Sequence, residues 1–81
     1  MAAGSAIVTT VRRGTRYTEA NRALAARTAK ELGIPNVLRG NDSIEELRKT
    51  YNVDAVLVAR QGHLTLVTAE GEMFFHPGIA H

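Results

Sequence analysis

Two short apolar stretches decide the fold: Ala6–Val11, with the sequence AIVTTV, and Ala55–Ala59, with the sequence AVLVA. Both stretches are rich in β-branched residues and are bounded by polar residues or glycine, which is typical of buried strands. Helical periodicity fills the chain between them, and two hairpin signals follow the second stretch. The sequence therefore predicts the element order β-α-β-α-β-β-β.

The first helix is predicted over Thr18–Leu32. Thr18 is the candidate N-cap, Gly33 is the candidate C′ residue, and Pro35 prevents any continuation. At 100° per residue one arc of this helix collects its small and apolar side chains, and we expect that arc to be buried. The arc contains Tyr17, Ala20, Leu24, Ala25, Thr28, Ala29 and Leu32.

A short second strand is predicted over Asn36–Arg39, and a second helix follows it. Ser43 and Glu46 have the spacing of a capping box, in which the hydroxyl accepts from the third helical N–H and the carboxylate reaches back to the cap. Asn52 can adopt the left-handed conformation with which a chain leaves a helix. The second helix is therefore short but has clear signals at both ends.

The C-terminal part of the chain predicts a meander with turns at Gln61–Gly62 and Glu70–Gly71. The paired strands are His63–Thr68 and Glu72–Phe75, and Pro77 ends the second of them because proline cannot donate to a ladder. Successive residues of a strand point to opposite faces, so one of Phe74 and Phe75 is expected to lack cover in the isolated domain.

The predicted fold class is α/β, with a mixed sheet of about five strands in the order 2-1-3-4-5 and two helices. Right-handed crossovers place both helices on one face, unless the chain reverses direction across the sheet. A chain of 81 residues has room for one small domain. We expect a flexible start over residues 1–5, a single α/β accessory domain over residues 6–78, and the beginning of a linker to a missing catalytic domain at residues 79–81.

Composition limits the function classes. The chain has no cysteine, which excludes disulfides and thiolate metal ligands and fits a reducing, cytoplasmic location. Its longest uncharged stretch, residues 1–11, is too short to span a bilayer, so no membrane role is expected. The three histidines lack the spacing of a metal site, and no nucleophile–base pair is present in the sequence. No catalytic, cofactor-binding or metal-binding residue is therefore assigned.

Charge is distributed unevenly along the chain. Residues 11–39 contain seven basic residues against two acidic ones, a balance of +5, whereas residues 40–81 have a balance of −3. Ligands of parallel α/β sheets gather at the carboxyl ends of the strands, and we expect the two helix N-termini, near Thr18 and Ser43, at the same edge. Arginine there would suit the phosphates of RNA. The candidate phosphate-binding residues are Thr10, Arg12, Arg13, Arg16, Arg39 and Arg60.

An alternative leaves part of this cluster neutral. Arg39 and Arg60 could pair with Asp42, with Asp54 or with the carboxylates of the second helix. Such pairing would occupy the guanidinium groups and weaken the case for RNA.

The chain resembles the N-terminal portion of bacterial S-adenosylmethionine-dependent methyltransferases of the ribosomal RNA small-subunit methyltransferase J-like group. The resemblance rests on an ordered set of segments that spans nearly the whole chain. These are residues 7–10 followed by arginine, residues 29–35 with Val37 and Arg39, then Ser43, Leu47 and Tyr51, the strand at residues 54–58, and the closing FFHPGIA at residues 74–80.

In that family the segment precedes the catalytic domain. The resemblance implies that S-adenosylmethionine is the cofactor of a longer parent protein, and that its site lies outside this chain, which lacks the acidic residue and glycine-rich turn of the donor site. It implies an accessory role here, with a catalytic methyltransferase domain in cis and ribosomal RNA as expected partners. Thr10, Arg12, Arg13 and Arg39 match the family pattern.

The sequence therefore supports two roles. One is RNA-phosphate contact through the arginine-rich strand ends. The other is protein interaction, in which an edge strand or the Phe74–Phe75 segment docks onto the catalytic domain or onto a second copy of the chain, giving a homodimer.

Overall fold

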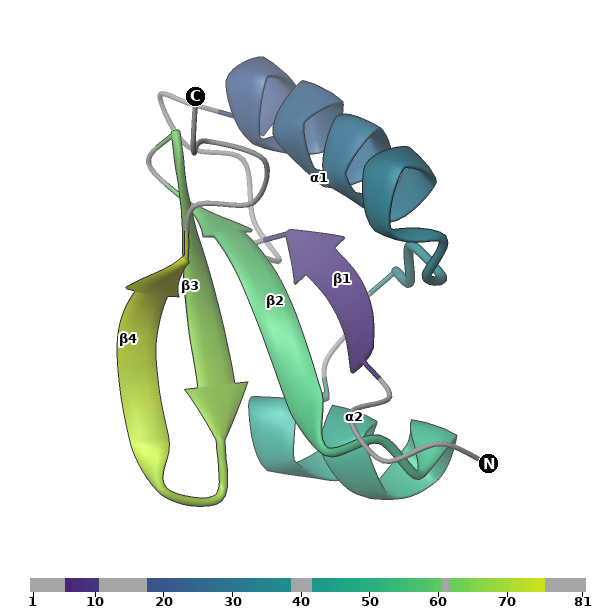
Figure 1. Ribbon diagram of the computed structural model, residues 1–81, viewed down its shortest axis with the longest axis vertical. Coiled ribbons are helices and arrows are strands. Elements are labelled where there is room, and N and C mark those ends of the chain that lie inside the picture. The colour runs from purple at the N-terminus through teal and green to yellow at the C-terminus, as the bar shows by residue number, and fades with distance from the viewer. Residues whose placement is uncertain (1–5, 11–17, 39–41, 61, 76–81) are drawn as a thin grey trace.

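The computed structural model describes residues 6–10, 18–38, 42–60 and 62–75. They form a small α/β fold with one mixed sheet and two helices (Figure 1). The elements are β1 (Ala6–Thr10), α1 (Thr18–Leu32), α2 (Ile44–Tyr51), β2 (Ala55–Arg60), β3 (His63–Thr68) and β4 (Gly71–Phe75).

The strand order in the sheet is β1-β2-β3-β4. β1 and β2 are parallel, with Ala6 opposite Ala55 and Thr10 opposite Ala59. β2, β3 and β4 form an antiparallel meander. The parallel half and the antiparallel half therefore share β2, which is buried along Val56–Ala59.

The fifth strand, expected over Asn36–Arg39, is not among the strands of the described residues, and Arg39 itself lies outside them. The segment is reduced to one parallel bridge between Val8 and Asn36. The Val8 N–H donates to the Pro35 carbonyl at 2.9 Å, and the Val37 N–H donates to the Val8 carbonyl at 2.8 Å. Pro35, just before the bridge, has no N–H with which to extend the ladder. Leu38, just after the bridge, is 93% exposed.

The helices pack against opposite faces of the sheet, the outcome expected if the chain reverses direction across the sheet rather than the one shared face expected otherwise. α1 covers a cluster containing Val8, Leu57 and Leu64, whereas α2 covers a cluster containing Ile7 and Val56. After α1 the chain reaches Asn36, which bridges to β1 on the side away from β2. The chain then crosses β1 in the opposite direction to form β2 on its other side. Two right-handed crossovers in opposite directions put their helices on opposite faces.

α1 has the predicted bounds, but its buried face is rotated from the expected arc. Thr18, the expected N-cap, is the first helical residue. Asn21 is fully buried beside Ala25 and Thr28, whereas Leu32 is 42% exposed. Asn21 Oδ1 accepts from the Gly62 N–H at 2.9 Å, which ties α1 to the connection between β2 and β3. A polar anchor therefore occupies a position that the apolar pattern omitted.

α2 has the predicted capping box. The Glu46 N–H donates to Ser43 Oγ at 3.1 Å, and the Ser43 N–H donates to Glu46 Oε1 at 3.0 Å. Asn52 ends the helix in the left-handed conformation, with φ of 53° and ψ of 53°. Leu47 is the buried residue of this helix. Within the described part of the chain, neither helix is long and apolar enough to cross a membrane.

Candidate functional site

The strand-end rim, defined here as the edge of the sheet where β1 and β2 finish, contains two of the six predicted phosphate-binding residues. Thr10 ends β1 and Arg60 ends β2, and the parallel register places Thr10 opposite the residue before Arg60. These two residues therefore lie at one edge, as expected. The other four, Arg12, Arg13, Arg16 and Arg39, lie outside the described residues.

Arg60 makes an ion pair at this edge. Its Nη2 atom lies 2.9 Å from Glu72 Oε1, across the central strand β3. The carboxylate thus comes from β4, a source that the sequence reading did not include. The two side chains remain 39% and 58% exposed, so the pair contributes about 0.2–1 kcal/mol to stability. The pair also affects ligand binding, because a phosphate would have to compete with Glu72 for the guanidinium group of Arg60.

The two helices lie at different ends of the sheet. Figure 1 shows α1 along the end at which β1 and β2 finish, and α2 along the end at which β2 begins. The arrangement brings α1 close to the strand-end rim and keeps α2 away from it. The prediction that both helix N-termini meet at that rim is therefore wrong for α2.

A hollow with a volume of about 610 Å³ opens on the face that carries α2, over the antiparallel half of the sheet. Its lining residues come from β2, β3 and β4, and the sequence predicted a phosphate-binding role for Arg60 and a docking role for Phe74 among them. They are Arg60, His63, Thr65, Glu72, Met73 and Phe74. The His63 and Phe74 rings meet edge to face with their centroids 6.0 Å apart. The hollow thus combines an ion pair, a hydroxyl and an aromatic surface.

The hollow exists because α2 covers only part of its face. The cluster beneath α2 is built on Ile7 of β1 and on Val56 and Val58 of β2, with Val67 at its border. The eight residues of α2 span about 12 Å at 1.5 Å per residue. That length covers the parallel half and leaves the same face of β3 and β4 without a helix among the described elements.

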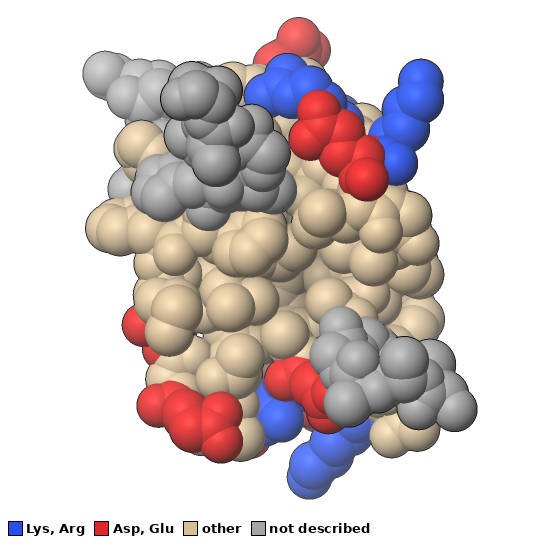
Figure 2. All heavy atoms as spheres, in the orientation of Figure 1, with Lys and Arg blue, Asp and Glu red and all other residues tan. Residues whose placement is uncertain are grey.

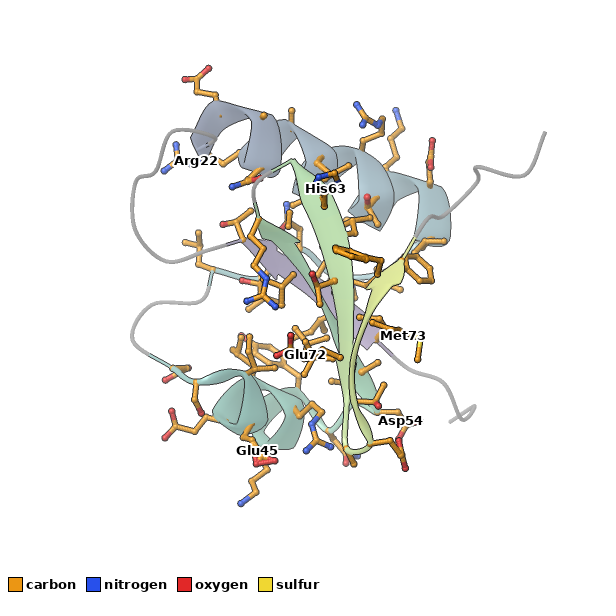
Figure 3. All side chains as sticks on the ribbon, turned by 90° about the vertical axis from the view of Figure 1, so that its left-hand side faces the viewer. Arg22, Glu45, Asp54, His63, Glu72 and Met73 are labelled. Atoms are coloured by element: carbon orange, nitrogen blue, oxygen red, sulfur yellow. The ribbon has the colours of Figure 1, made fainter. Side chains whose placement is uncertain are left out.

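The side chains of β4 are exposed on both faces of the sheet. Phe74 is 71% exposed and Met73 is 62% exposed. Figure 3 shows Glu72 and Met73 on opposite sides of the sheet, as the alternation of a strand requires. Phe75 packs against the cluster under α1, so Phe74 is the uncovered member of the phenylalanine pair.

One edge of β4 has no neighbouring strand among the described residues. Thr68 and Gly71 flank the turn at residues 69–70, so the Gly71 N–H points to β3. Backbone groups alternate along a strand, and those of Glu72 and Phe74 therefore point to the open edge. Charged residues and proline usually discourage pairing at an edge; β4 contains one charged residue, Glu72, and no lysine, arginine or proline.

Figure 2 shows the molecule in the orientation of Figure 1, with most of the visible charged side chains near the upper and lower ends of that view. Among the described residues no group of three or more histidine, aspartate or glutamate side chains is arranged to hold a metal ion.

No protein-family model, curated protein or solved structure matches the chain. The resemblance to methyltransferase N-terminal segments therefore remains a prediction.

Proposed function

We propose that this chain is an interaction module that binds another polypeptide as an added strand along the open edge of β4. The observation that carries the proposal is an apolar edge strand with no strand of the described residues on its outer side, whose Phe74 and Met73 side chains are mostly exposed. Adding a strand satisfies the outward backbone groups of Glu72 and Phe74. It also covers apolar surface on both faces of the sheet, which strengthens the association.

The hollow gives the added strand specificity. In strand addition the backbone hydrogen bonds supply affinity, and pockets for alternate side chains select the sequence. A side chain from the partner that projects toward the α2 face meets Phe74, the His63 ring and the Arg60–Glu72 pair. The partner suggested by the sequence resemblance is a methyltransferase catalytic domain, and the other candidate is a second copy of the chain.

A strand peptide tests the proposal. An extended peptide of alternating valine and threonine, added at millimolar concentration to the isotope-labelled chain, should shift the amide resonances of Glu72 and Phe74 most. Phe74→Lys places a charge on the edge and should remove these shifts, whereas Leu38→Lys, an exposed control distant in sequence from β4, should leave them unchanged. Shifts that are absent, or equally large in the Phe74→Lys variant, would contradict strand addition.

RNA-phosphate contact remains a prediction beside this proposal. Its favourable feature is the shared rim of Thr10 and Arg60, and its weakness is that Glu72 already holds Arg60. Salt separates the two roles. Binding through phosphates falls steeply as salt rises, whereas addition of an apolar strand changes little.

A further inference from the structure

We propose that the strand added to β4 is β4 of a second copy, paired antiparallel about a two-fold axis that passes between the two Phe74 residues. This inference rests on the proposed docking role and names the partner. The resulting dimer would join two four-stranded sheets into one continuous sheet, with each α1 on one face and each α2 on the other.

The backbone of β4 is complementary to itself in this register. The N–H and C=O groups of Phe74 point to the open edge, so Phe74 of each copy exchanges both hydrogen bonds with Phe74 of the other. A two-fold interface requires the same patch to contact itself, and a single antiparallel strand edge meets that condition.

The side chains match on both faces of the sheet. On the α2 face, Phe74 lies against its symmetry mate, which covers the most exposed aromatic ring of the described chain. On the α1 face, Met73 of one copy lies opposite Phe75 of the other, a contact of sulfur with an aromatic ring. Apolar groups therefore meet apolar groups at each position near the axis.

Charge selects this register over the neighbouring one. Glu72 is the only charged residue of β4, and Arg60 of the same chain holds its carboxylate. With Phe74 on the axis, the two Glu72 positions are four residues apart along the strands, about 13 Å at 3.3 Å per residue. With Met73 on the axis they are two residues apart, about 7 Å, and the like charges oppose each other more strongly.

Sedimentation equilibrium of the unmodified chain, from micromolar to millimolar concentration, tests whether the dimer forms. We expect a reversible monomer–dimer equilibrium, and at least a tenfold higher dissociation constant for Phe74→Lys. A chain that stays monomeric at millimolar concentration would overturn the second-copy inference. If the valine–threonine peptide still shifts the Glu72 and Phe74 amides of that monomer, strand addition survives; if it does not, both proposals fail.

Single cysteines test the register cleanly, because the chain has none of its own. In Phe74→Cys the two sulfur-bearing residues form a hydrogen-bonded pair with Cα atoms about 5.5 Å apart, within the range of a disulfide. In Met73→Cys, the matched control, the two positions are diagonal at about 7–8 Å and too far apart. Mild oxidation should therefore cross-link Phe74→Cys at least tenfold faster. Faster cross-linking of Met73→Cys would place Met73 on the axis and overturn the proposed register.

Discussion

The parallel half and the antiparallel half of the sheet differ in how completely they are covered. β1 and β2 lie between α1 on one face and α2 on the other, and their central residues are buried. β4, at the far side of the antiparallel half, has four exposed residues in five. A chain of 81 residues buries a smaller share of its surface than a larger domain does, and here the apolar side chains left exposed include Met73 and Phe74 of β4.

This difference predicts unequal sensitivity to truncation. Leu57→Ala removes a side chain of β2 that is 1% exposed in the cluster under α1, and should lower the free energy of unfolding by about 2–5 kcal/mol. Met73→Ala on β4 should change it by less than about 0.5 kcal/mol, because that side chain is already exposed. Urea denaturation measures both, and equal losses in the two variants would contradict the contrast between the halves.

A substitution at Thr9 tests how firmly the segment around Val37 is held against β1. Its hydroxyl donates to the Val37 carbonyl at 2.7 Å, and the residue is fully buried. Thr9→Val keeps the shape but removes the donor, and should cost about 1–3 kcal/mol because the carbonyl loses its partner. Thr9→Ser keeps the hydroxyl and is the control. A valine variant as stable as the natural chain would show that this bond contributes nothing.

The Arg60–Glu72 pair is predicted to contribute little to stability. Because both groups are partly exposed, a double-mutant cycle with Arg60→Ala and Glu72→Ala should report a coupling of about 0.2–1 kcal/mol that decreases with salt. If instead Arg60 binds an RNA phosphate, Arg60→Ala should lower the slope of log RNA affinity against log salt concentration by about one. An unchanged salt dependence would remove Arg60 from any RNA-binding surface.

Local signals predicted much of the fold. The Ser43–Glu46 capping box, the left-handed Asn52 and the end of α1 before Gly33 depend on neighbouring residues, and each forms as expected. The turn before β4 is also local, but it lies at residues 69–70, one position before the predicted Glu70–Gly71, and Gly71 already belongs to β4. Elements with signals at both ends could therefore be placed from sequence alone.

Non-local features could not be predicted in the same way. The segment after Pro35 has strand composition, but its pairing depends on β1 and stops at one bridge. The partner of Arg60 lies twelve residues later in the sequence, on a strand that is not its neighbour. Alternation predicted one uncovered phenylalanine, but the choice of Phe74 required knowing that α1, and not α2, extends its cluster to β4.

Amide hydrogen exchange at Phe74 tests the docking role of β4 most directly. Its N–H points to the open edge, whereas the N–H of Met73 points to β3 and serves as an internal reference. As the concentration of the chain rises, we predict that exchange at Phe74 and Glu72 slows while exchange at Met73 stays constant. Equally fast exchange at Phe74 in dilute and concentrated samples, with the strand peptide present or absent, would contradict a binding edge at β4.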